Sequence, residues 1–269
     1  MTSSGKQPVA DRLYMQTTGK GEPLVMLHGW GFHSGVWGHF AEQLSESFRL
    51  TLVDLPGHGR SSMACPLQLD SVVSQILSRI TEPVHWLGWS LGASIIMRLA
   101  SIAPGQVRSM SLLAASPCFV QTGSWRSGIR ADILAQFEHS LETDYRKTLM
   151  KFIALQTLSG NDAKMVLTDL REKLFQSGSP DKLALQQGLD ILANADLRAE
   201  MTASNNRCLV VLGERDQLVP SSVSEFYRGL GCKPRVEIIN GAGHVPFISH
   251  LDQTTEMVRK FITVVPLTL

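Results

Sequence analysis

A serine stands between two glycines in the segment 88–92, whose sequence Gly-Trp-Ser-Leu-Gly has the pattern G-x-S-x-G. The apolar run VHWL precedes the serine's turn directly, and the helical pattern SIIMRLA follows it. A turn from strand to helix holds a serine oxygen at the positive end of the helix, where it can attack a carbonyl carbon. We therefore predict that Ser90 is a nucleophile on a surface-facing turn; the structural alternative is a glycine-rich helix cap.

An acid and a base follow this serine in the order Ser, Asp, His. Asp216 comes after a later apolar run, in Gly-Glu-Arg-Asp, and His244 ends the small-residue loop Gly-Ala-Gly-His. A carboxylate can orient the histidine, which then removes the serine proton. Glu214 and His250 are the local competitors for these two roles. We predict the triad Ser90, Asp216 and His244.

A further glycine-rich loop, His-Gly-Trp-Gly at 28–31, follows the first apolar run. Attack on a carbonyl places negative charge on its oxygen, and two backbone N–H groups must receive that charge. We expect these groups to come from Trp30 in this loop and from Leu91 after the nucleophile. We interpret His28 as a structural histidine. The predicted chemistry is ester hydrolysis through an acyl-enzyme, which requires no metal and no organic cofactor.

Short apolar runs alternate with helical patterns on both sides of a central segment. This alternation favours a doubly wound, mostly parallel sheet with helices on both faces, and the serine's setting identifies it as an α/β-hydrolase fold. Residues 11–16 could add an antiparallel edge strand. The predicted strands are 24–28, 50–54, 84–88, 107–114, 208–213 and 235–239. The predicted helices between them are 35–45, 90–103, 220–230 and 252–263.

The alternation stops in the segment 116–206, which contains no strand-like run. Four amphipathic patterns follow one another there, so we predict an all-helical lid inserted into the hydrolase core. The core then comprises 1–115 and 207–269. Open α/β sheets bind ligands at the carboxyl edge of their strands, and we expect the lid over that edge. The four predicted lid helices are 129–141, 144–158, 162–176 and 180–193.

Composition excludes several classes of partner. The 25 basic and 24 acidic residues give a net charge of +1, so nothing favours binding to nucleic acid or to an anionic membrane. No apolar run reaches the length of a membrane span and no signal peptide is visible, so we expect a cytoplasmic protein. The four cysteines show no zinc-binding spacing, and we expect free thiols. They are Cys65, Cys118, Cys208 and Cys232.

With these motifs in view, the chain resembles the pimeloyl-acyl-carrier-protein methyl ester carboxylesterases of biotin synthesis over nearly its whole length. The matching stretches are LHGWG, LVDLPGHGRS, WLGWSLG, ASPCF, FIALQT and HVPFISH. The resemblance implies removal of the methyl group from a pimeloyl-carrier methyl ester by the same triad. It also implies substrate contacts from Trp30, Ser90, Leu91, Phe152, Ile153, Ala154, Leu155, Gln156 and His244.

The resemblance further implies that lid cations hold an acidic acyl-carrier protein. The matching positions are Lys147, Lys151 and Lys164, whereas Thr168 departs from the family's pattern. Lysine keeps the charge of arginine but loses its bidentate fork. The alternatives are a general short-chain esterase or lactonase, a C–C bond hydrolase, and a non-catalytic receptor of the same fold. We expect a monomer.

Overall fold

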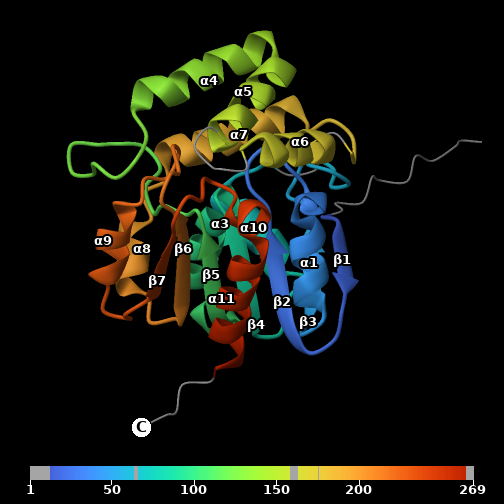
Figure 1. The fold of residues 1–269 in the computed structure, drawn as a ribbon, viewed down its shortest axis with the longest axis vertical. Helices are drawn as coiled ribbons and strands as arrows, with labels where there is room; N and C mark the ends of the chain where they lie inside the picture. The colour runs from blue at the N-terminus through green and yellow to red at the C-terminus, as the bar shows by residue number, and fades with distance from the viewer. Residues whose placement is uncertain (1–12, 64–65, 158–162, 175, 265–269) are drawn as a thin grey trace, which may run out of the picture.

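A computed structural model describes residues 13–63, 66–157, 163–174 and 176–264. Seven strands form one sheet in the order β1-β3-β2-β4-β5-β6-β7, and all neighbours are parallel except β1 and β3 (Figure 1). The strands are β1 Met15–Thr18, β2 Glu22–Leu27, β3 Phe48–Val53, β4 Val84–Trp89, β5 Val107–Leu113, β6 Cys208–Gly213 and β7 Arg235–Ile239. The predicted α/β-hydrolase sheet is therefore confirmed, and the edge strand lies slightly later than expected.

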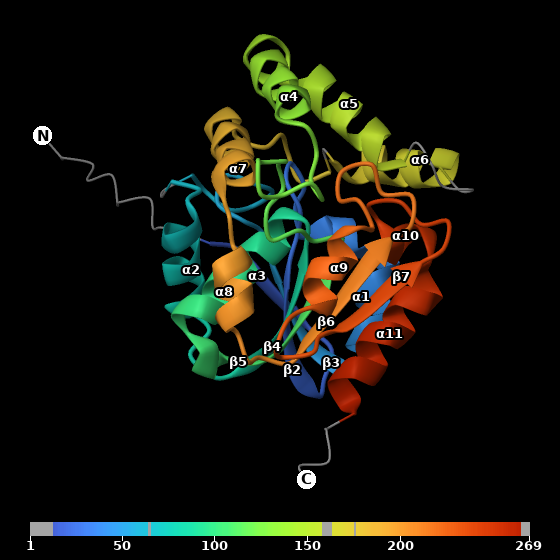
Figure 2. The same ribbon diagram turned by 90° about the vertical axis from the view of Figure 1, so that its left-hand side faces the viewer.

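The central strands are mostly apolar because helices cover both faces of the sheet. Every residue of β4 and of β6 is buried. Helices α1 (Gly38–Ser45) and α11 (Leu251–Thr263) pack on one face (Figure 2). Helices α2 (Leu69–Leu77), α3 (Leu91–Ile102) and α8 (Arg198–Ala203) lie on the other, and α9 (Val223–Arg228) contacts β7.

Some elements differ from the sequence predictions. The predicted helix 35–45 begins as a 3₁₀-helix, Ser34–Trp37, before α1 continues it. Helices α2 and α8 were not predicted. Helix α8 has six residues, of which only Met201 is buried, so its sequence shows no hydrophobic period. The remaining short helices are a 3₁₀-helix at Pro104–Gln106 and α10 at Pro246–Ser249.

Four helices lie above the carboxyl ends of the strands, and we call them the cap (Figures 1 and 2). They are α4 Ala131–Thr143, α5 Tyr145–Thr157, α6 Ala163–Leu174 and α7 Lys182–Asn194. Helix α8 instead packs against α3 beside the sheet. The division of the chain at 115/116 and 206/207 stays a prediction.

The strand order changes direction between β2 and β4, beneath the cap. Strand β2 lies between β3 and β4. The chain continues from β2 to β3 on one side of this point, and from β4 to β5 on the other side. Loops that leave such a pair of strands diverge, and ligands of open α/β sheets bind between them. The loop with Trp30 follows β2, and Ser90 follows β4.

Candidate active site

Ser90 occupies a strained turn between β4 and α3. Its backbone has φ 53° and ψ −115°, a region that residues with side chains rarely adopt. A Cβ at Gly88 would lie 2.6 Å from the nitrogen of Ala93, and one at Gly92 would collide with the carbonyl oxygen of Leu27. The two glycines of the motif are therefore required by the close approach of the backbone, which explains why this turn reads G-x-S-x-G.

His244 and Asp216 form a hydrogen-bonded pair at the same edge. The Nδ1 of His244 lies 2.7 Å from Oδ2 of Asp216, and both side chains are fully buried. The other carboxylate oxygen accepts the backbone N–H groups of Leu218 and Val219, at 2.8 and 3.0 Å. Because a carboxylate only accepts, Nδ1 of His244 must carry the proton and Nε2 is left as the acceptor.

The two competitors for these roles lie elsewhere in the hydrogen-bond network. Glu214 is exposed and accepts the backbone N–H of Gly241 at 2.9 Å. His250 pairs its Nδ1 with the hydroxyl of Ser249 at 2.9 Å. Of the two candidate acids, only Asp216 contacts the His244 ring.

Two buried polar atoms of the candidate triad have no hydrogen-bond partner among the described residues, the hydroxyl of Ser90 and Nε2 of His244. Such atoms are rare in folded proteins because an unmade buried hydrogen bond costs about 1–3 kcal/mol. One atom can donate and the other can accept. Our prediction that Ser90 faces the surface is wrong, because Ser90 is 5% exposed and lies at the sheet edge beneath the cap.

His28 and Trp30 have separate tasks in the loop after β2. His28 donates from Nδ1 to the carbonyl of Gly29 and accepts the N–H of Leu55, and burial with neighbouring His58 lowers its pKa to about 3. It is a neutral structural residue, as its position suggested. Trp30 is 1% exposed and donates its indole N–H to the carbonyl of Leu185 in the cap, at 2.8 Å.

The end of α5 contacts the loop that carries His244. The carbonyl oxygen of Gln156 accepts the backbone N–H of His244 at 3.4 Å. The side chain of Gln156 is buried, and neither of its amide atoms has a partner in the described part of the chain. Phe152 and Ile153 are also buried, with the Phe152 ring edge-on to Trp30 at 4.8 Å, whereas Ala154 and Leu155 are half-buried.

Comparison with known proteins decides the family. The model of the alpha/beta hydrolase family matches residues 24–257. The chain belongs to this family. A pimeloyl-[acyl-carrier protein] methyl ester esterase of Xanthomonas axonopodis pv. citri is 40% identical over 94% of this chain and 100% of its own length. One from Methylococcus capsulatus is 36% identical over 93% of this chain and 98% of its own. The resemblance drawn from the sequence is thereby confirmed.

Solved structures agree on the alpha/beta hydrolase fold. An esterase from Exiguobacterium antarcticum superposes with a TM-score of 0.84 at 21% identity, covering 94% of this chain and 96% of that one. An enol-lactonase from Burkholderia xenovorans gives 0.80 at 18% identity, covering 94% and 96%. At this level of identity, the likeness concerns the fold alone.

The lysines expected to hold a carrier protein lie on the cap. Lys147 and Lys151 are exposed on α5, and Lys164 is exposed on α6. None of the three forms an ion pair with a described carboxylate, whereas Lys173 contacts Asp169 at 2.8 Å. Their role in docking stays a prediction.

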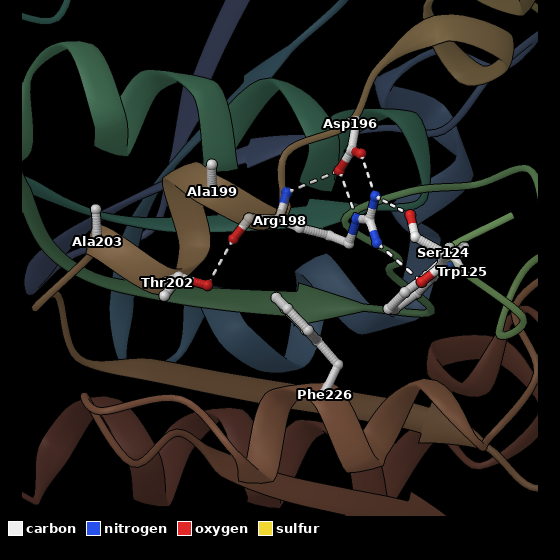
Figure 3. Close-up of a pocket in the computed structure, with 8 residues that line it drawn as sticks. All are labelled: Ser124, Trp125, Asp196, Arg198, Ala199, Thr202, Ala203 and Phe226. Carbon is white, nitrogen blue, oxygen red and sulfur yellow. Dashed lines mark hydrogen bonds and ion pairs between the residues drawn. The ribbon is translucent and has the colours of Figure 1, made fainter. Parts of the chain in front are cut away.

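A hollow of about 830 Å³ lies between α8 and α9, away from the candidate active site (Figure 3). The guanidinium of Arg198, which lines this hollow, donates to both carboxylate oxygens of Asp196 and to Ser124. Trp125 and Phe226 are its aromatic lining residues. None of its lining residues belongs to the candidate triad or to the loop with Trp30, so it is a separate feature.

Three further observations concern partners. Within the described ranges, no cluster of three or more His, Cys, Asp or Glu side chains could hold a metal ion. No helix there is long and apolar enough to cross a membrane. Cys118, Cys208 and Cys232 are free thiols, and Cys65 lies outside the described residues.

Proposed function

We propose that this alpha/beta hydrolase is a serine carboxylesterase that converts pimeloyl-acyl-carrier-protein methyl ester to pimeloyl-acyl-carrier protein and methanol in biotin biosynthesis. The observation that carries the proposal is the buried pair of His244 and Asp216, with Nε2 unpartnered at the edge where Ser90 also has an unpartnered hydroxyl. The names of the relatives at 36–40% identity support the substrate.

In the proposed first half-reaction, the hydroxyl oxygen of Ser90 attacks the carbonyl carbon of the methyl ester while Nε2 of His244 takes its proton. Asp216 stabilises the imidazolium that forms. The backbone N–H groups of Trp30 and Leu91 receive the negative charge of the tetrahedral intermediate. His244 then gives the proton to the departing methoxide, and methanol leaves an acyl-enzyme at Ser90.

In the second half-reaction, water attacks the acyl-enzyme with His244 again as the base, and Ser90 is regenerated with the free carboxylate as product. All proton transfers pass through one imidazole, so this cycle needs no metal and no organic cofactor. The turn at Ser90 lies at the N-terminus of α3, whose dipole favours the developing negative charge.

The cap supplies the proposed contacts to the carrier-linked acyl chain. We propose that the apolar residues of α5 line its path. Gln156 has a buried amide with no partner among the described residues, which supports a bond to a polar group of the substrate. Lys147, Lys151 and Lys164 are the proposed docking groups for the acidic carrier protein. We also propose a monomer that acts in the cytoplasm, where its cysteines stay reduced.

The test is methanol release from pimeloyl-carrier methyl ester, measured beside hydrolysis of a short p-nitrophenyl ester. Ser90→Ala must abolish both activities, and Ser94→Ala, one turn further along α3 and also buried, must keep them. If the protein hydrolysed the small ester alone, the result would favour a general esterase over the carrier-specific enzyme. A Ser90→Ala variant with near-parental rates would refute the serine mechanism.

A further inference from the structure

The indole of Trp89 joins the strand that carries the nucleophile to the loop that carries the base. Trp89 is the last residue of β4, directly before Ser90, and is 1% exposed. Its Nε1 donates to the backbone carbonyl of His244 at 2.9 Å. Its ring centroid also lies 5.8 Å from that of the His244 imidazole. One side chain therefore spans the distance between the two reacting residues' backbones.

The Trp89 ring has little freedom to move. A Cβ at Gly29 would lie 2.8 Å from Cε3 of this ring, so the loop that also carries Trp30 passes directly over it. The rings of Phe32 and Phe247 contact it from other sides, at centroid distances of 5.3 and 5.2 Å. Because packed interiors resist small displacements, the indole N–H is held in one place.

Among the described residues, the backbone of His244 has one other hydrogen bond, and it comes from the cap. Its N–H reaches the carbonyl of Gln156 at 3.4 Å, which is long for a hydrogen bond. The bond from Trp89 is shorter and comes from the sheet itself. The shorter of these two backbone bonds therefore ties the His244 loop to the core, and the longer one ties it to the cap.

We propose that Trp89 is a positioning residue, whose indole N–H holds the His244 loop so that Nε2 stays within reach of the Ser90 hydroxyl. This inference rests on the proposed esterase mechanism. Loss of the N–H leaves the His244 carbonyl buried without a donor and lets the loop shift. A displacement of about 1 Å in a reacting group can cost on the order of 100-fold in rate. The expected loss is in kcat, with KM nearly unchanged.

Trp86 provides a matched control on the same strand. It is fully buried, and its Nε1 donates to the backbone carbonyl of Gln106 at 3.1 Å, at the opposite edge of the sheet from Ser90. Trp86→Phe and Trp89→Phe thus each remove one indole–carbonyl bond, which is buried at Trp89 and partly buried at Trp86. A purely structural role predicts the same behaviour from both variants.

The experiment measures kcat and KM on a p-nitrophenyl ester, the melting temperature, and the rate at which a fluorophosphonate labels Ser90. Trp89→Phe should lower kcat and the labelling rate at least tenfold with KM within twofold, and Trp86→Phe should leave kcat within twofold of the parent. Equal kcat losses in both variants, or none in Trp89→Phe, would overturn the inference.

A second substitution guards against misfolding of Trp89→Phe. Benzothienylalanine at position 89 keeps the shape of the indole and replaces its N–H by sulfur, so it removes the donor alone. The same drop in kcat is expected, and parental kcat would overturn the inference. A parent chain that neither hydrolyses the ester nor reacts with the fluorophosphonate would instead refute the proposed function.

Discussion

Two arginines on the sheet core lie against carboxylates, whereas five exposed cations of the cap have no such partner among the described residues. Arg60 contacts Asp54 at 3.1 Å, and Arg98 contacts Asp70 at 2.7 Å. On the cap, five exposed cations form no ion pair with any described residue, and they are Lys147, Lys151, Lys164, Arg171 and Lys182. These five cap cations are available to a charged partner, and we propose that the acidic carrier protein contacts them, whereas the chemistry takes place on the core.

The core also buries neutral histidines, whereas His139 of the cap is exposed. His28 and His58 lie within one cluster, with ring centroids 5.4 Å apart, beneath the loop that carries Trp30. Burial keeps both rings uncharged, so their hydrogen bonds hold the loops after β2 and β3 at neutral pH. The core is thus built for fixed geometry.

Core and cap meet at two residues of the candidate site. The ring of Trp30 lies between Phe152 of α5 and Gly188 of α7, where a Cβ on the glycine would come within 2.6 Å of Cδ1. Gln156 contacts the backbone of His244. The position of the cap is therefore linked to both the proposed oxyanion loop and the base.

The largest expected effect belongs to the core. Asp216→Asn should lower kcat about 10⁴-fold on any ester, because the amide no longer fixes the tautomer of His244 or stabilises its charge. Glu214→Gln is the matched control and should keep kcat, since Glu214 contacts the backbone N–H of Gly241 and the guanidinium of Arg215 rather than the His244 ring. Steady-state kinetics on a p-nitrophenyl ester measures kcat for both variants. A catalytic defect in Glu214→Gln rather than in Asp216→Asn would reassign the acid.

Acid should destabilise the core through its buried histidines. Burial lowers the pKa of His58 from 6.5 to about 4, so the unfolded chain binds the proton first and stability falls as the pH drops through this window. Between pH 7 and pH 5 this residue should remove about 2 kcal/mol from the free energy of unfolding.

His58→Asn should flatten that dependence, because asparagine can still donate to the carbonyl of Pro56 but does not titrate. His39→Asn, at a side chain 80% exposed, is the control that should leave the pH dependence as it is. Urea unfolding at each pH gives the comparison. Parallel curves for His58→Asn and the parent would contradict the assignment.

Reversing charge on the cap should affect one substrate class only. Lys147→Glu with Lys151→Glu should lower kcat/KM for carrier-bound ester about tenfold, by weakening attraction to the acidic carrier, and should spare a small ester. Lys20→Glu with Lys260→Glu makes the same change of charge on the sheet core, where it also breaks the ion pair of Lys260 with Glu256, and should spare both. Equal losses on both substrates in the cap variant would remove the distinction between core and cap.

The contact between core and cap at Trp30 should show the smallest effect. Gly188→Ala places a methyl group against the Trp30 ring, which cannot retreat because Phe152 and the bond to Leu185 hold it. Overpacking of this kind costs about 1–3 kcal/mol, and we expect about a fivefold loss of kcat/KM. Gly105→Ala, where a Cβ meets nothing within 4 Å, is the control. Parental kinetics in Gly188→Ala would show that the cap moves independently of the oxyanion loop.

The sequence predicts the sheet and the loops that carry Ser90, Asp216 and His244, because strand runs and small-residue turns are local signals. Topology then brings those loops to one edge. The burial of Ser90 and the bond between Trp89 and His244 have no local signal, since both depend on how distant segments pack. The same holds for the bond that the Trp30 indole makes to the carbonyl of Leu185 in the cap.

The most direct test of the account compares kcat/KM for pimeloyl-carrier methyl ester with that for free dimethyl pimelate as the salt concentration rises. We predict a preference for the carrier-bound ester that falls about tenfold between roughly 50 and 500 mM salt, as screening weakens the attraction between cap and carrier. The rate on the free diester should stay constant. Equal and salt-independent values for the two substrates would contradict the division between a catalytic core and a carrier-binding cap.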